Sequence, residues 1–388
     1  MPSPPDLAAL RSLESLVQTA GTLVKQLQDV LIAIRKLPEP SESSSSGPST
    51  LADSHNALTL ARDSATLVRA HATKISLLII NEPFTPSAVS TILTELVSGP
   101  LPGLAVCVQA CDSSLYPVVF KRELAWRCER TLSELYDLLQ KIPKDGKVLS
   151  GKRKDGFASQ DRGSIASTGL LWAACDNVIE LANMGVGGFF VQKMNEWKDT
   201  LNDIMTELKE WSEEEPDEED EDEDEDEDDD TASQPDDPAD QIGGNNTSTQ
   251  SMLDDLMNSH QNIPLSDPDG IRPRLESSLR RIRLVVLLYQ AITKRRMKKL
   301  PPFPPTSPEK KLPQRLDEIA NLLEKLPDRF GDLAGAFYEL RPREIDDAMD
   351  QCFLDAFAAS ELLGKSWDGS ADDFTEWTGK FQLEIKKP

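Results

Sequence analysis

The sequence predicts an all-α protein built as two helical bundles that are joined by a disordered acidic linker. Three observations support this prediction. Apolar residues recur every three to four positions over long stretches, which is the period of one helix face. No stretch alternates apolar and polar residues over the length of a strand. One tract, Glu213 to Asp230, holds 17 acidic residues in 18 positions and separates two helix-rich halves. We therefore expect an N-terminal bundle over residues 1-212, a linker over 213-269 and a four-helix bundle over 270-388.

Composition sets limits on the compartment and the partners. The chain has 388 residues and a net charge of −25, most of which resides in the acidic tract. That charge argues against sequence-independent nucleic-acid binding, because phosphates would be repelled. Five cysteines, mostly among apolar neighbours, suggest free thiols in a reducing intracellular compartment. We find neither a signal-peptide pattern nor an apolar run of about 20 residues, and therefore expect no membrane partner.

The first half predicts a series of helices. Three of seven heptad positions are apolar over about residues 6–36, a width that suits a helix packed against two neighbours, with a leucine zipper as the alternative. Thr85 and Pro86 form a helix-start signal, and the Pro/Gly cluster at 99–103 predicts a stop and restart. The remaining helices are expected at about 51–80, 86–97, 103–116 and 118–142, and a Pro/Ser-rich loop is expected at 38–50.

The stretch from Ser164 to Trp211 carries two helical patterns that meet at glycines 185, 187 and 188. Because glycine permits a sharp reversal, the simplest interpretation is two antiparallel helices that share one core. Trp172 and Trp197 are expected in that core, whereas Trp211 is expected to be partly exposed beside the acidic tract.

The second half predicts four helices, at about 271–299, 316–326, 343–363 and 372–387, with a proline-rich connection at 301–313. The first of these ends in a basic cluster, Lys294 to Lys299. A solvated helix end explains such a cluster, because cations are favoured near unsatisfied carbonyls. Nuclear import, or pairing with the acidic tract, is the functional alternative.

A resemblance follows from the segment Gly169-Leu170-Leu171-Trp172-Ala173-Ala174-Cys175, which leads through an amphipathic helix into the acidic tract. Together with the kinked helix pair around Leu115-Tyr116-Pro117, this segment resembles the cyclin-D-binding protein family, over most of residues 7–211. The resemblance implies two all-α bundles and a non-enzymatic regulator of cell-cycle progression and transcription. It also implies binding to cyclin D and to helix-loop-helix-type partners, in nucleus and cytoplasm.

The acidic tract lacks the glycine and the ligand spacing of a calcium loop, so a solvating spacer or a docking segment for basic proteins such as histones remains. We predict no catalytic, cofactor-binding or metal-binding residues. The three histidines are scattered, Cys107 and Cys111 lack further ligands, and the glycine joint follows a helix instead of a strand. The candidate partner-binding residues are Glu213, Asp220, Asp230, Arg295, Arg296, Lys298 and Lys299.

These observations predict a protein-interaction module and no enzyme. The leading hypothesis is a regulator that binds a cyclin or a helix-loop-helix-type protein. The alternatives are a vinculin-like or catenin-like helical adaptor and an acidic chaperone of histones or other basic proteins.

Overall fold

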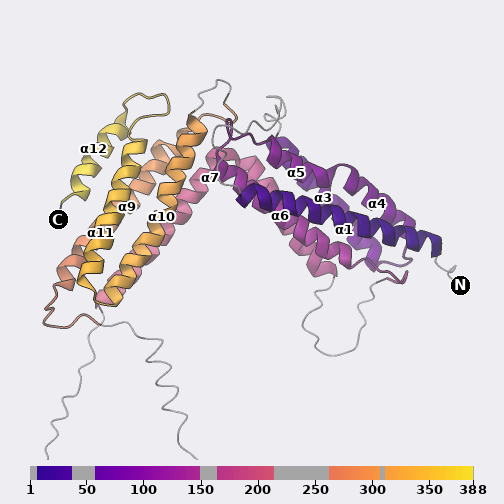
Figure 1. Cartoon of the computed structure of the whole chain (residues 1–388), viewed down its shortest axis with the longest axis horizontal. Coiled ribbons are helices and arrows are strands. Elements are labelled where there is room, and N and C mark those ends of the chain that lie inside the picture. The colour runs from indigo at the N-terminus through magenta and orange to yellow at the C-terminus, as the bar shows by residue number, and fades with distance from the viewer. Residues whose placement is uncertain (1–6, 37–56, 149–163, 214–261, 306–310, 388) are drawn as a thin grey trace, which may run out of the picture. The chain divides into compact units, whose positions relative to one another are not determined.

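The computed structural model describes residues 7–36, 57–148, 164–213, 262–305 and 311–387, and within these ranges it contains helices and no strands (Figure 1). The prediction of an all-α fold is confirmed. The expected loop at 38–50 and all of the acidic tract except Glu213 lie outside the described residues. The helices are α1 (Leu7–Lys36), α3 (Ala57–Ile80), α4 (Pro86–Ser98), α5 (Pro100–Ala110), α6 (Val118–Gln140), α7 (Ser164–Glu213), α9 (Ile271–Arg295), η1 (Met297–Lys299), α10 (Leu312–Tyr338), α11 (Pro342–Leu363) and α12 (Asp373–Ile385).

The chain forms two compact units, each assembled from separate segments. Unit 1 comprises Met1–Asn195, Ala291–Leu322 and Leu362–Thr375. Unit 2 comprises Glu196–Gln290, Leu323–Glu361 and Glu376–Pro388. Both units therefore draw on the two halves of the sequence, and the division at 212/213 and 269/270 stays a prediction.

In unit 1, α1 packs against both α6 and α4, as the width of its apolar stripe predicts. Leu13, Ala20, Val24 and Leu31 of α1 are buried by these neighbours. These residues belong to two of the three apolar heptad rows, one with Leu13 and Ala20 and one with Val24 and Leu31. Both rows are buried inside the bundle, because adjacent rows on a helix face different neighbours. The expectation that this helix serves two neighbours is confirmed.

The stop and restart between α4 and α5 are confirmed. Pro86 and Pro100 each stand at the first turn of their helix, where a missing N–H leaves no intrahelical bond unmade. The Thr85 side chain does not cap α4, and its hydroxyl instead donates to the Pro83 carbonyl at 3.2 Å. By length and composition alone, the continuous stretch Pro86–Ala110 could cross a membrane, which differs from our expectation, and 44% of its most apolar window is buried within the protein.

The start of α6 receives its cap from a residue far along the chain. The residue before α6 is Pro117, which has no polar side chain to accept the first free N–H groups. The buried carboxylate of Asp317, on α10, accepts from the N–H of Val118 at 2.8 Å and from the N–H of Val119 at 2.9 Å. A segment of the second half of the sequence therefore completes unit 1.

Helix α7 corrects our interpretation of the Ser164–Trp211 stretch. Helical hydrogen bonding continues through the glycines, and a single residue, Gly185, has a non-helical conformation with φ 64° and ψ −171°. The arm before Asn195 belongs to unit 1, and the arm from Glu196 belongs to unit 2. The prediction of a hairpin with one shared core is wrong, because the glycines give a kink in place of a reversal.

In unit 2, the second arm of α7 packs against α10. Trp211 is 5% exposed, and its ring centroid lies 5.3 Å from that of Tyr338 and 6.5 Å from that of Phe337. Its expected partial exposure is therefore wrong. Trp172 is 37% exposed and Trp197 is half-buried, so the expectation of core positions for these two also fails.

Helix α10 is longer than predicted because it continues through Pro327. Proline has no N–H, so Pro327 leaves the carbonyl of Leu323, four residues earlier, without its helical donor. The buried Tyr289 hydroxyl of α9 donates to this carbonyl at 2.5 Å. The replacement of a backbone donor by a side chain explains how the helix passes a residue that usually ends it.

Candidate partner-binding groove

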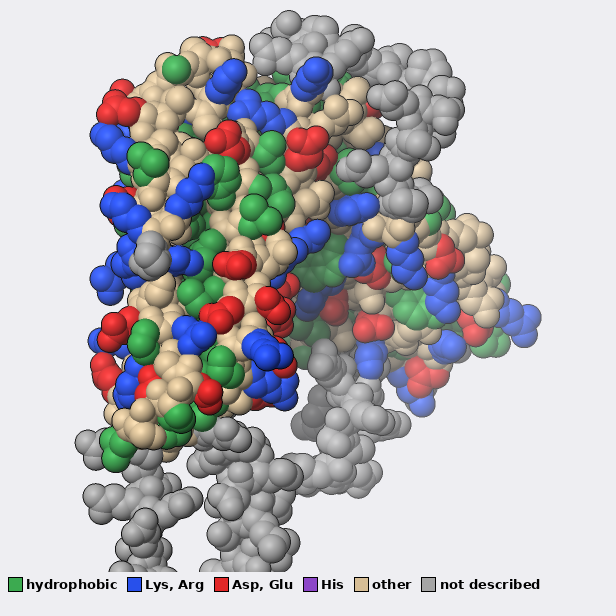
Figure 2. All heavy atoms as spheres, turned by 60° about the vertical axis from the view of Figure 1, so that its left-hand side comes forward, with side chains coloured by type: hydrophobic (Ala, Val, Ile, Leu, Met, Phe, Trp, Pro, Cys, Tyr) green, Lys and Arg blue, Asp and Glu red, His purple; other side chains and the backbone are tan. Residues whose placement is uncertain are grey.

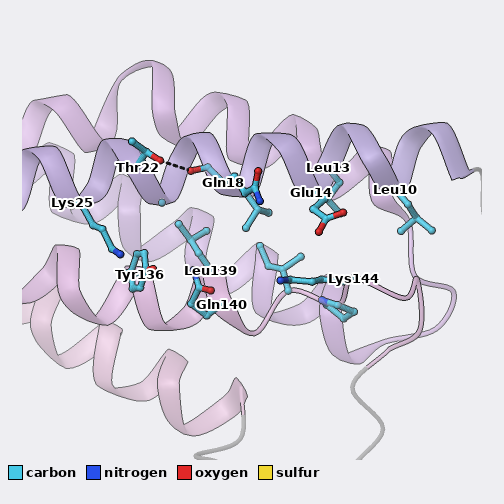
Figure 3. Close-up of a pocket in the computed structure, with 14 residues that line it drawn as sticks. Leu10, Leu13, Glu14, Gln18, Thr22, Lys25, Tyr136, Leu139, Gln140 and Lys144 are labelled. Atoms are coloured by element: carbon cyan, nitrogen blue, oxygen red, sulfur yellow. Dashed lines mark hydrogen bonds between the residues drawn. The ribbon is translucent and has the colours of Figure 1, made fainter.

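A groove runs along α1 where that helix meets the end of α6, within unit 1 (Figure 3). It has a volume of about 380 Å³, which falls in the range of pockets that bind ligands or peptide side chains. Its lining combines apolar and polar side chains from both helices: Leu10, Leu13, Glu14, Val17, Gln18, Gly21, Thr22, Lys25, Tyr136, Leu139, Gln140, Ile142, Pro143 and Lys144.

The apolar surface of the groove lies deepest. Leu13, Leu139 and Ile142 are almost fully buried, and Leu10 and Val17 are half-buried beside them. The polar side chains of Glu14, Gln18 and Lys25 are exposed along the α1 rim. This order, with an aliphatic base and a polar rim, is the one found in grooves that accept an amphipathic helix.

The Tyr136 ring is held at one end of the groove by two residues of α1. A side chain at Gly21 would place its first carbon 3.3 Å from Cε2 of Tyr136, so glycine allows the ring to lie against the helix backbone. The Lys25 ammonium lies 4.7 Å from the ring centroid, within reach of a cation–π interaction. The ring is therefore fixed as a wall of the groove, and its position does not require a bound partner.

The groove is elongated along α1. Its lining residues on that helix run from Leu10 to Lys25, which corresponds to about 22 Å at the helical rise of about 1.5 Å per residue. Four turns of a docked helix would match this length. A compact cofactor needs a more rounded and more enclosed site.

The predicted basic cluster is divided by the structure. Arg295, Lys298 and Lys299 are exposed, and Arg295 makes an ion pair with Asp373 at 3.6 Å. Arg296 is only 1% exposed, so its predicted place in an accessible partner-binding surface is wrong. The sequence from Lys294 to Lys299 does not indicate that one cation of the cluster points inward.

Arg296 instead links the loop between α11 and α12 to the end of α9, within unit 1. Its guanidinium donates to both carboxylate oxygens of Asp372, at 2.7 and 2.9 Å, and to the Leu363 carbonyl at 2.9 Å. The side chain also lies over the Phe374 ring, 4.4 Å from its centroid. The hydrogen bonds from Arg296 hold the pKa of Asp372 well below its usual range. These contacts give Arg296 a structural role.

Of the acidic candidates, Glu213 is the last residue of α7 and is exposed, whereas Asp220 and Asp230 lie outside the described residues. Their roles in partner binding stay predictions. Figure 2 shows acidic, basic and hydrophobic side chains interspersed over one face of the molecule. Such mixing is typical of a solvated surface.

The cysteines behave as small apolar residues. All five are free and buried, and burial raises the pKa of the Cys175 thiol to about 12. Such a thiol stays protonated at neutral pH, so it is a poor nucleophile and a poor metal ligand. Within the described ranges, no three His, Cys, Asp or Glu side chains are grouped so that they could hold a metal ion.

Sequence patterns did not predict the groove, although they predicted both of its helices. The residues missed are Gly21, Lys25, Tyr136 and Lys144. Gly21 was the available signal, since a glycine inside a long regular helix costs stability and usually has a packing reason. The partner of that glycine, Tyr136, lies on another helix, and periodicity within one helix does not identify it.

Comparison with known proteins supports an interaction role. Residues 61–214 match the family model described as Grap2 and cyclin-D-interacting, N-terminal. An uncharacterized protein of Schizosaccharomyces pombe is 24% identical to this chain over 342 residues, which cover 86% of this chain and 85% of that protein. The matched residues include the α6 wall of the groove, and α1 precedes them. The resemblance seen in the sequence is confirmed over residues 61–214, which match the N-terminal domain of the Grap2 and cyclin-D-interacting family.

Proposed function

We propose that this protein is a non-enzymatic regulator that binds a D-type cyclin or a helix-loop-helix-type protein and thereby acts on cell-cycle progression or transcription. The observation that supports this proposal is the family match over residues 61–214, because the family is described by its interaction with cyclin D. We further propose that it works in nucleus and cytoplasm, without a cofactor.

The fold is consistent with this role. Rigid helical bundles offer preformed grooves, and a partner helix can dock into one with little ordering cost in the receptor. The α1–α6 groove has the length, the aliphatic base and the polar rim for such docking. It is the surface on which we propose that a partner binds.

The direct test uses the purified full chain and purified D-type cyclins and helix-loop-helix proteins. Titration calorimetry is expected to show saturable one-to-one binding to a member of at least one class. An unrelated helical bundle with a net charge similar to that of the tested partner serves as the control ligand. This control is needed because a chain of charge −25 attracts basic proteins unspecifically. If neither class binds more tightly than it binds the control bundle, the proposed function is refuted.

A further inference from the structure

The charges on the groove rim contrast with the charge of the whole chain. Lys25, Lys144 and Glu14 are the charged lining residues, so the rim is net positive in a chain of net charge −25. All three are exposed, and within the described part of the chain neither lysine makes an ion pair with a carboxylate. Among the described residues, two cations beside the groove are therefore open to a partner.

Lys25 lies on α1 and Lys144 lies in the segment that follows α6, and the two lysines lie toward opposite ends of the groove (Figure 3). Lys25 is anchored over the Tyr136 ring, which limits the number of positions its ammonium adopts. An anchored cation loses less side-chain entropy when it meets a carboxylate than a freely moving one does. The rim therefore favours acidic groups at both ends of a bound apolar segment.

We infer that the α1–α6 groove binds an amphipathic helix whose aliphatic face is flanked at both ends by carboxylates. The aliphatic face would contact Leu10 and Val17, the half-buried apolar side chains of the groove, and the flanking carboxylates would meet Lys25 and Lys144. This inference rests on the proposed function for the choice of a protein partner. It adds the chemistry by which that partner would be recognised.

The test uses two model helices of about 18 residues, a length of about 27 Å that covers the groove. Both carry leucines on one face, and they differ only in having glutamates or lysines as the flanking residues. Binding to the full chain is measured by fluorescence anisotropy near physiological salt, where charges beyond about 8 Å are screened. General attraction to an acidic chain favours the lysine peptide, so a preference for glutamate must arise from the local rim.

We expect the glutamate peptide to bind about five- to tenfold more tightly, as two exposed ion pairs would provide. The double variant Lys25→Glu, Lys144→Glu should remove or invert that preference. Gln18→Trp should fill the groove and abolish binding of the glutamate peptide. Gln26→Trp is the matched control, because Gln26 is exposed on the same helix and does not line the groove.

Thermal unfolding by circular dichroism establishes that both tryptophan variants are folded. Equal peptide affinity in Gln18→Trp and Gln26→Trp would overturn the groove as the site, and equal affinity for the two peptides would overturn the acidic preference. The outcome is separable from that of the proposed function. A failure of cyclins to bind leaves the peptide result intact, and cyclin binding that survives Gln18→Trp places the cyclin elsewhere.

Discussion

The hydroxyl of Tyr289 substitutes for the N–H that Pro327 lacks, and this relation predicts a specific energetic coupling. Replacing Tyr289 by phenylalanine removes the hydroxyl from a buried ring. The Leu323 carbonyl then loses the donor that lies 2.5 Å away. A buried acceptor that loses its donor costs about 1–3 kcal/mol of unfolding free energy. Burial also raises the pKa of Tyr289 well above its usual value, so the hydroxyl remains a donor at all ordinary pH values.

The magnitude changes when the backbone donor is restored. In Pro327→Ala, the new N–H can bond the Leu323 carbonyl as in a regular helix, and the interior proline penalty of up to about 3 kcal/mol is relieved. Tyr289→Phe should then cost about 1 kcal/mol or less, because the carbonyl keeps a partner. The double-mutant cycle should therefore show a coupling energy of about 1–2 kcal/mol.

The assay is urea unfolding of the wild type, both single variants and the double variant, followed by far-UV circular dichroism. Because the chain has two compact units, the transition of unit 2 must be fitted separately from that of unit 1. Additive effects, within about 0.5 kcal/mol, would refute the reasoning. In that case the Tyr289 hydroxyl and the Pro327 gap would be neighbours without any energetic relation.

Three further predictions concern unit 1 and the α7 kink. Asp317→Ala should destabilise by about 1–3 kcal/mol in urea unfolding, because the first N–H groups of α6 lose a charged acceptor, whereas the exposed neighbour variant Glu318→Ala should stay within about 0.5 kcal/mol; similar losses for both would contradict the cap. Gly185→Ala should lower stability by about 1–3 kcal/mol, since its φ of 64° and ψ of −171° suit glycine alone, while the helical control Gly169→Ala should be neutral or stabilising in the same thermal melts. Asp372→Asn should be less stable than wild type at pH 7, and the difference should shrink at pH 3. The folded-state pKa of Asp372 is depressed, so the contribution of this carboxylate to the unfolding free energy is complete above the ordinary carboxyl pKa of about 4. That contribution is lost as the pH falls below this value toward the folded-state pKa. An unchanged difference in unfolding free energy between the two pH values would exclude the Arg296 pairing as its source.

Local patterns predicted the helices well because each pattern resides in the residues of one segment. The apolar period of α1 and the prolines that open α4 and α5 act within a turn or two of the chain. The errors arose where a distant partner decides. The extension of α10 through Pro327 depends on the hydroxyl of Tyr289. This hydroxyl bonds the carbonyl of Leu323, which lies 34 residues further along the chain.

The same limit explains the misplaced side chains. A tryptophan on an apolar face can be covered by a neighbouring helix, as Trp211 is, or left at the edge, as Trp172 is. Arg296 stands in a run of cations, and the sequence gives no sign that its side chain points inward, because its acceptors lie at residues 363 and 372. For the groove, α1 gave the length and the apolar stripe, and the contact of Gly21 with Tyr136 needed the tertiary structure.

The discontinuous make-up of unit 1 has a practical consequence for mapping interactions with fragments. A fragment trimmed to residues 61–214 keeps Tyr136 but lacks α1, and it also lacks the carboxylate that receives the first amides of α6. If such a fragment failed to bind a partner, the cause could be the absence of the α1 side of the groove or the unfolding of the fragment. The failure would therefore not show that a contact residue is missing. Point substitutions in the full chain, each paired with a neighbour that faces away, are therefore the informative way to locate a partner on this protein.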